Sequence, residues 1–331
     1  SDLLTHELSH SWNGKYRRPA DLTTPDFQAP MKDDLLWVYE GLTQYLGFVL
    51  AGRSGIRTPQ QTREFLALAA AALDNTPGRD WRPLIDTAVE AQLLYEAPEQ
   101  WAAWRRGVDF YDEGLLIWLE ADVTIRKLTN GSRSLDDFCK LFHGGTSGPP
   151  AVKTYTLDDV VAALNSVARY DWRAFLDARV RALTPRAPMG GIEGAGWKVV
   201  FADTLSGVMK ALAEANDRMD LSYSIGLTLE TGEGKKGMVV DVVPGSPAAR
   251  AGVAPGVTVV AVDARHWSKE VMLDAVAATK SGAPLELLVD NGEFYRSCKL
   301  DYRGGPRYPQ LARVAGAHDV LGEIVRPHAA R

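Results

Sequence analysis

Cysteine is nearly absent from this sequence of 331 residues, which carries only Cys139 and Cys298. Two cysteines so far apart supply neither a disulfide framework nor a cysteine-based metal site. Positive charge is not in excess either, since the formal net charge is −5. Without a broad positive field, the chain has no electrostatic basis for binding nucleic acid or an anionic membrane surface. We therefore expect a small-molecule or peptide ligand and no nucleic acid.

A long uncharged hydrophobic run is missing as well. The most apolar stretch covers Leu35 to Gly52, "LLWVYEGLTQYLGFVLAG", and it contains one charge, Glu40. A membrane-spanning helix needs about 20 predominantly apolar residues, and a charge near the bilayer centre is costly. The stretch therefore predicts a buried core helix and no membrane span. No signal peptide is visible at the start of the sequence.

The two halves of the chain differ in their patterns. Apolar residues recur mostly at helical spacing up to about residue 182. After the Gly- and Pro-rich stretch "TPRAPMGGIEGAG", short β-branched runs such as "GMVVDVVPG" and "VTVVAVDA" predict strands. We predict a multidomain protein of α and β class, with a mainly α-helical domain followed by a small β-rich domain. The expected parts are a helical domain over 1–190, a connecting segment over 191–219, the β-rich domain over 220–302, and a C-terminal tail over 303–331 that packs back on the body.

The clearest chemical motif is HExxH in "LLTHELSHSW". In a helix, His6 and His10 project from one face a turn apart, close enough to share one metal ion, with Glu7 beside them. Imidazole nitrogens suit Zn²⁺, and a catalytic zinc keeps three protein ligands plus a water. The motif therefore predicts one zinc ion per chain and requires a third ligand. The alternative is an amphipathic helix with two surface histidines.

Glu40 is the candidate for the third ligand. A carboxylate in so apolar a helix is expensive to bury unless it is paired or coordinated. An ion pair with an arginine such as Arg17, Arg18 or Arg53 would serve the same purpose, and the sequence leaves that alternative open.

The same motif predicts a hydrolytic mechanism. Zinc would bring the pKa of a water towards neutrality, and Glu7 would accept its proton. A developing oxyanion then needs a hydrogen-bond donor, for which a tyrosine is suitable. Spacing alone does not choose among Tyr39, Tyr45, Tyr95 and Tyr111.

With these residues in view, the sequence resembles a known family. The segment "HELSHSWNGKYRRPADLTTPDF", followed by "LWVYEGLTQYLGFVLAGRSG", is similar to the glycyl aminopeptidase family, which comprises PDZ-carrying zinc peptidases of the gluzincin clan. "YDEGLLIWLEADVTIR" and the tail "YRGGPRYPQLAR" agree with it. The resemblance implies His6, His10 and Glu40 as zinc ligands and Glu7 as general base. It also implies a C-terminal portion of a larger enzyme, with an N-terminal β-rich region upstream as a partner.

The resemblance also selects a tyrosine. In the related alanyl and leukotriene-hydrolysing aminopeptidases, a "YxKG" tyrosine stabilises the oxyanion, and "YDEG" places Tyr111 at that position. Glu113 stands where those relatives usually have lysine, which is a departure from the pattern. Gln44 lies one turn after Glu40 and either orients a ligand or packs as a helix amide, of which the second is favoured.

The β-rich half resembles a PDZ domain of the bacterial protease type, on the segments "LSYSIGLTLETG" and "GMVVDVVPGSPAARAGVAPGVTVVAVDARHW". Such domains add a peptide strand to a sheet edge and hold its terminal carboxylate on backbone N–H groups. The implied peptide-binding loop is Ser224, Ile225, Gly226 and Leu227. Possible partners are therefore peptide substrates and C-terminal peptide tails. A docking or structural role for this domain is an equal alternative.

The function implied by the resemblance is a zinc-dependent aminopeptidase that removes small N-terminal residues such as glycine or alanine. The alternatives are a zinc endopeptidase assisted by the PDZ-like domain and a non-catalytic peptide-binding module. Many relatives are bacterial and exported, so the resemblance favours the periplasm as the compartment.

Overall fold

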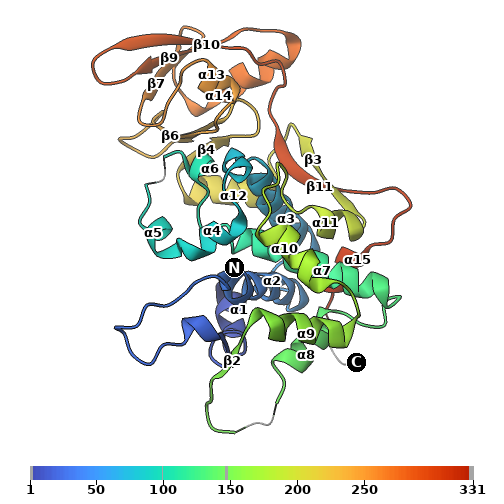
Figure 1. Cartoon of the computed structure of the whole chain (residues 1–331). Helices are drawn as coiled ribbons and strands as arrows, with labels where there is room; N and C mark the ends of the chain where they lie inside the picture. The colour runs from blue at the N-terminus through green and yellow to red at the C-terminus, as the bar shows by residue number, and fades with distance from the viewer. Residues whose placement is uncertain (1–2, 99, 146–147, 328–331) are drawn as a thin grey trace.

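The computed structural model describes residues 3–98, 100–145 and 148–327, and it shows a helical part below a β-rich part (Figure 1). One hydrophobic core joins residues from Leu35 to Trp197 with Leu321, Ile324 and Val325, and a second runs from Met219 to Leu300. The chain therefore has mixed helices and small sheets, as expected, arranged around two cores.

The helical part consists of short and long helices that follow one another along the chain. They are α1 (Leu3–Ser9), η1 (Ala20–Leu22), α2 (Leu36–Arg53), α3 (Pro59–Asp74), η2 (Pro77–Asp80), α4 (Leu84–Val89), α5 (Ala91–Tyr95), α6 (Ala102–Arg105), α7 (Asp112–Leu128), α8 (Leu135–Phe142), α9 (Leu157–Val167), α10 (Trp172–Val180) and α11 (Gly190–Gly194). Strands β1 (Arg17–Pro19) and β2 (Lys153–Tyr155) form a small parallel pair.

Helix α2 is the centre of the helical part. Its apolar residues are buried on nearly all sides, and it packs against both α1 and α7. The approach to α7 is close because glycines face each other. A Cβ added to Gly41 would lie 2.8 Å from the Cα of Gly114, which no real side chain tolerates. This contact fixes the residue after Glu40 against the first turn of α7.

The β-rich part holds two sheets and two short helices. One sheet has the order β4–β5–β6, with β4 (Arg218–Leu221), β5 (Leu227–Glu230) and β6 (Val239–Val242). The other has the order β10–β9–β7–β8, with β7 (Thr258–Val262), β8 (Arg265–His266), β9 (Leu285–Asp290) and β10 (Tyr295–Leu300). Helices α13 (Pro247–Arg250) and α14 (Lys269–Ala278) and the turn η3 (Thr279–Ser281) complete it.

The C-terminal segment returns to the helical part. Strand β11 (Tyr308–Arg313) pairs antiparallel with β3 (Trp197–Ala202), and α15 (Val320–Val325) packs against α2. Arg53 donates a hydrogen bond from Nε to the Ile324 carbonyl at 2.8 Å. Helix α12 (Gly207–Ala215) links the two parts and contacts α3. The last four residues of the predicted tail lie outside the described residues.

Within the described residues, no helix is long and apolar enough to cross a membrane. Helix α2, which contains the most apolar stretch of the sequence, lies in the core of the helical part.

Candidate active site

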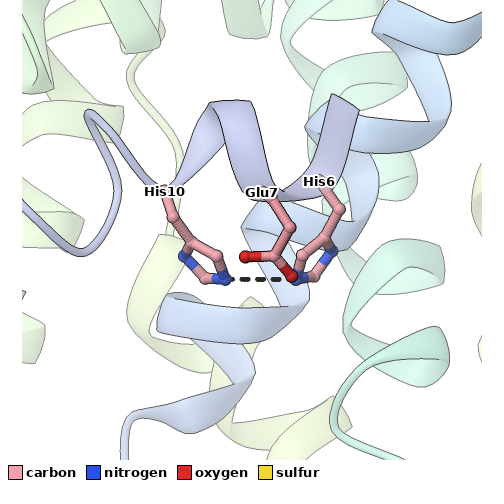
Figure 2. Close-up of side chains that lie close together, drawn as sticks. All are labelled: His6, Glu7 and His10. Carbon is pink, nitrogen blue, oxygen red and sulfur yellow. Dashed lines mark hydrogen bonds between the residues drawn. The ribbon is translucent and has the colours of Figure 1, made fainter. Parts of the chain in front are cut away.

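The HExxH residues lie on and just after α1. His6 is buried, His10 is partly buried and Glu7 is exposed. Figure 2 shows the three side chains on the same side of the helix, as a spacing of four residues predicts. One ligand atom from each lies within 4.8 Å of the others. The described residues give the Glu7 carboxylate no hydrogen-bond partner, so it is available to a small molecule.

Glu40 brings a carboxylate oxygen to the same point from α2. Its Oε2 lies 3.3 Å from His6 Nε2 and 3.2 Å from His10 Nε2, and the two Nε2 atoms are 3.1 Å apart. The arginine alternative for Glu40 is wrong, because Arg53 makes a two-bond pair with Asp136 instead. Arg18 bonds the Gly14 carbonyl, and Arg17 lies over the ring of Phe142.

The far side of each imidazole shows which nitrogen carries the proton. His6 Nδ1 lies 2.9 Å from Gln44 Oε1, and His10 Nδ1 lies 2.9 Å from the Asn13 carbonyl. Gln44 Nε2 donates to Asp112 Oδ1 at 2.9 Å, so its oxygen must face His6. Both Nδ1 atoms therefore donate, so in the neutral form of each imidazole the Nε2 atom presents a lone pair. The sequence favoured Gln44 as a packing amide. That prediction is wrong, because the Gln44 side chain orients His6.

When both imidazoles are neutral, the Nε2 lone pairs of the two histidines converge on the Glu40 carboxylate. The dashed line in Figure 2 joins the two Nε2 atoms, but two neutral imidazoles whose Nδ1 atoms donate have no Nε2 proton to share. Glu40 Oε2 is buried and has no hydrogen-bond donor among the described residues. Three electron-rich atoms packed this closely repel one another unless a cation lies between them. The donor set therefore fits a metal ion.

The local electrostatics favour the same conclusion. Burial raises the pKa of Glu40, but its contacts with His10 and His6 outweigh burial and hold the pKa below its usual value. Burial lowers the pKa of His10, but Glu40 and the Asn13 carbonyl outweigh burial and raise it. Both shifts mean that positive charge is stabilised at the point where the three side chains meet.

The spacing of the three atoms matches a tetrahedral ion. Metal–ligand bonds of about 2.0–2.1 Å place neighbouring ligands of a tetrahedron about 3.4 Å apart. The observed separations of 3.1, 3.2 and 3.3 Å form such a face. A fourth position then remains open, as catalytic sites require.

A cavity of about 360 Å³ lies beside this site. Its lining includes Glu40, Tyr39, Tyr95 and Tyr111 together with apolar side chains such as Phe110. The cavity is large enough for a short peptide segment and is contiguous with a metal-ligand candidate.

Tyr111 immediately precedes α7, and its ring centroid lies 5.9 Å from that of His6. Burial, followed by the hydrogen bond with Tyr95, raises the pKa of Tyr111 well above its usual value. Its hydroxyl therefore stays protonated and can donate a hydrogen bond. Of the other candidate tyrosines, Tyr45 is committed in the core, where its hydroxyl donates to Asp122 at 2.7 Å.

Glu113 does not replace a catalytic lysine. Its side chain is buried and pairs with Arg79 and with Arg106. The acidic residue that departs from the "YxKG" pattern is thus part of an internal ion cluster.

The predicted peptide-binding loop lies in the β-rich part, in the turn from β4 to β5. The backbone N–H groups of Ser224 and Gly226 donate to the Leu221 carbonyl at 3.1 and 2.9 Å, and Ser224 Oγ donates to it at 3.1 Å. Ile225 is buried, and Leu227 opens β5. Strand β5 pairs with β4 on one edge and with β6 on the other, so neither edge of β5 is free to receive a peptide strand. Peptide binding by this loop stays a prediction.

Two residues of the site were not identified as such from the sequence. They are Asn13, whose carbonyl orients His10, and Asp112, which orients Gln44. Tyr95 was one of the four candidate tyrosines, but its contact with the Tyr111 hydroxyl was not predicted. Asp112 belongs to the "YDEG" segment, and an acidic residue in the first turn of a helix usually reads as a response to the helix dipole. Only the packing of α2 against α7 reveals its second role.

Comparison with known proteins adds two findings. Residues 1–117 match the sequence model of the family described as M61 glycyl aminopeptidase. The structure resembles the crystal structure of an aminopeptidase N family protein from Idiomarina loihiensis, with a TM-score of 0.71 and 19% identity over 98% of this chain. The chain spans about half of that structure, 54% of its length, and the likeness shows a shared fold. A search of the curated proteins finds no match.

Proposed function

We propose that this protein is a zinc-dependent aminopeptidase that removes small N-terminal residues, glycine or alanine, from peptides, because residues 1–117 match the sequence model of the M61 glycyl aminopeptidase family. The family supports a peptidase. The zinc ion, the preference for small residues and the role of each side chain are parts of the proposal.

One observation carries it. The Nε2 atoms of His6 and His10 and the Oε2 of Glu40 lie 3.1–3.3 Å apart. Two imidazoles and one carboxylate with an open fourth position make the ligand set of a catalytic zinc peptidase site.

Each residue then has a chemical role. When bound, zinc supplies an acidified water and polarises the scissile carbonyl. The exposed carboxylate of Glu7 takes the proton of the attacking water and returns it to the leaving amine. The protonated hydroxyl of Tyr111 donates to the oxyanion that develops on the carbonyl. Gln44 and Asn13 hold the imidazoles in the tautomer that ligation requires.

The peptidase class is tested with two matched substrates. We expect the protein to hydrolyse a glycyl or alanyl peptide with a free N-terminal amine and to leave its N-acetylated counterpart intact. Release of the first residue is followed by mass spectrometry. Cleavage of both peptides at internal bonds would show an endopeptidase and contradict the proposal.

The metal site is tested by zinc content after dialysis against metal-free buffer. We expect about one zinc per chain in the parent and much less in Glu40→Ala, because the variant loses one of three ligands. Glu214→Ala, an exposed carboxylate on α12, is the matched control and should retain its zinc. Equal zinc in parent and Glu40→Ala would remove Glu40 from the ligand set.

A further inference from the structure

Tyr95 contacts the active site, but the proposed mechanism gives this residue no role. Its hydroxyl oxygen lies 2.7 Å from that of Tyr111, and both residues line the cavity that contains Glu40. Tyr95 ends α5, and its side chain is 61% exposed. An exposed aromatic side chain on a helix of five residues is expected to move between more than one rotamer. The hydrogen bond to the Tyr111 hydroxyl favours the rotamer in which the Tyr95 hydroxyl faces the site.

The direction of this hydrogen bond follows from the chemistry of Tyr111. A phenol has one proton to donate, and its oxygen can also accept. If Tyr111 gives its proton to the oxyanion, it has none left for Tyr95, so the shared bond must be donated by Tyr95. A hydroxyl that accepts a hydrogen bond is polarised and donates its own more strongly.

We propose that Tyr95 is a positioning residue that donates to the hydroxyl of Tyr111 and so directs the Tyr111 proton towards the scissile carbonyl. The inference rests on the proposed function. Tyr95 acts through Tyr111 and not on the substrate, so its effect on turnover disappears when the Tyr111 hydroxyl is absent.

The chain that follows α5 is held by contacts on both parts of the molecule. Asp241, on β6 of the β-rich part, accepts from the Trp101 backbone N–H at 2.7 Å, at the start of α6. At the other end of α6, Arg82 donates to the Arg105 carbonyl at 2.9 Å. The Trp81 indole donates to the Trp104 carbonyl at 3.1 Å.

The backbone flanking α6 shows that these contacts determine its conformation. Trp101 and Arg106 have φ angles of 61° and 59°, in the left-handed region that costs non-glycine residues about 1 kcal/mol or more each. Such conformations persist only where surrounding contacts impose them. The segment 101–106, which follows α5, is therefore anchored, and the β-rich part supplies one of its anchors.

The test is a double-mutant cycle of Tyr95→Phe and Tyr111→Phe, with kcat and KM measured on a glycyl peptide. Each substitution removes one hydroxyl and keeps the ring. We expect Tyr111→Phe to lower kcat about a hundredfold, as loss of an oxyanion donor does. Tyr95→Phe should lower kcat about tenfold with KM unchanged. The double variant should match Tyr111→Phe.

Binding of a glycyl phosphinate peptide provides a second measurement that does not depend on turnover. Its phosphinyl oxygens stand for the tetrahedral oxyanion, so Tyr95→Phe should weaken binding in the parent and not in the Tyr111→Phe background. Tyr170→Phe, at an exposed tyrosine between α9 and α10, is the control and should behave as the parent in both assays. Zinc content should be equal in every variant.

The outcomes separate the two proposals. An active parent with a fully active Tyr95→Phe variant overturns the positioning role alone. So does a Tyr95→Phe effect that persists without the Tyr111 hydroxyl, or one confined to KM, because each points to direct contact with the substrate. A parent that neither cleaves the peptide nor binds the phosphinate overturns the proposed function and this inference with it.

Discussion

The Glu7→Gln variant is expected to lose turnover of a glycyl peptide by about a thousandfold or more and to keep its zinc. A positioned general base contributes about 10²–10⁴-fold to a rate. Glutamine has nearly the same shape as glutamate but cannot accept the proton of the attacking water. The ligand atoms belong to His6, His10 and Glu40, so the metal should remain. The measurements are kcat by substrate hydrolysis and zinc per chain by plasma mass spectrometry.

The control for this experiment is Glu293→Gln, an exposed carboxylate in the turn between β9 and β10. It should have the parent's kcat and zinc content. If Glu7→Gln retained full activity, Glu7 would not be the base and the mechanism proposed above would be wrong. If it lost zinc together with activity, Glu7 would be needed for metal binding, and its role as a base would remain to be shown by kinetics at saturating zinc.

The Glu113→Gln variant is expected to lose about 3–5 kcal/mol of unfolding free energy, as breaking a buried ion pair does. The Glu113 carboxylate is 1% exposed and accepts from Arg79 at 2.9 and 3.0 Å. Arg106, also buried, donates to the same carboxylate and pairs with Asp109. Without the negative charge of Glu113, Arg106 keeps its ion pair with Asp109, but Arg79 loses the only carboxylate that it contacts among the described residues.

The loss is measured by urea unfolding, followed by the fluorescence of the tryptophans buried in the helical core, such as Trp37, Trp118 and Trp172. Glu96→Gln, an exposed carboxylate just after α5, is the control and should stay within about 0.5 kcal/mol of the parent. A Glu113→Gln variant as stable as its parent would show that the cluster is solvated or rearranges. Since Tyr111 lies two residues before Glu113, lower activity in this variant is an expected secondary effect.

Local spacing determined much of the candidate site. A four-residue separation in a helix is enough to place His6 and His10 on one face, because helical geometry depends on the backbone alone. Glu40 was identifiable because it is the one charge in the apolar stretch from Leu35 to Gly52, and such a carboxylate needs a partner. The change from helical periodicity to short β-branched runs likewise indicated a helical part and a β-rich part.

The tertiary structure decided which partners these residues find. Gln44 orients His6 only because Asp112, on another helix, takes its amide group. Residues that meet across helices leave no periodic signal in the sequence. The contact of Tyr95 with Tyr111 and the pairing of Glu113 with Arg79 are of the same kind.

The β-rich part shows the same division. The turn "SYSIG" between β4 and β5 ends in Gly226, whose φ of +83° is a backbone conformation that glycine adopts freely. The sequence did not determine which strands pair with β5, and in the structure β4 and β6 occupy its two edges. Chemistry that depends on spacing along one helix was thus determined by the sequence. Hydrogen bonds and charges that meet between elements were decided by the packing of those elements.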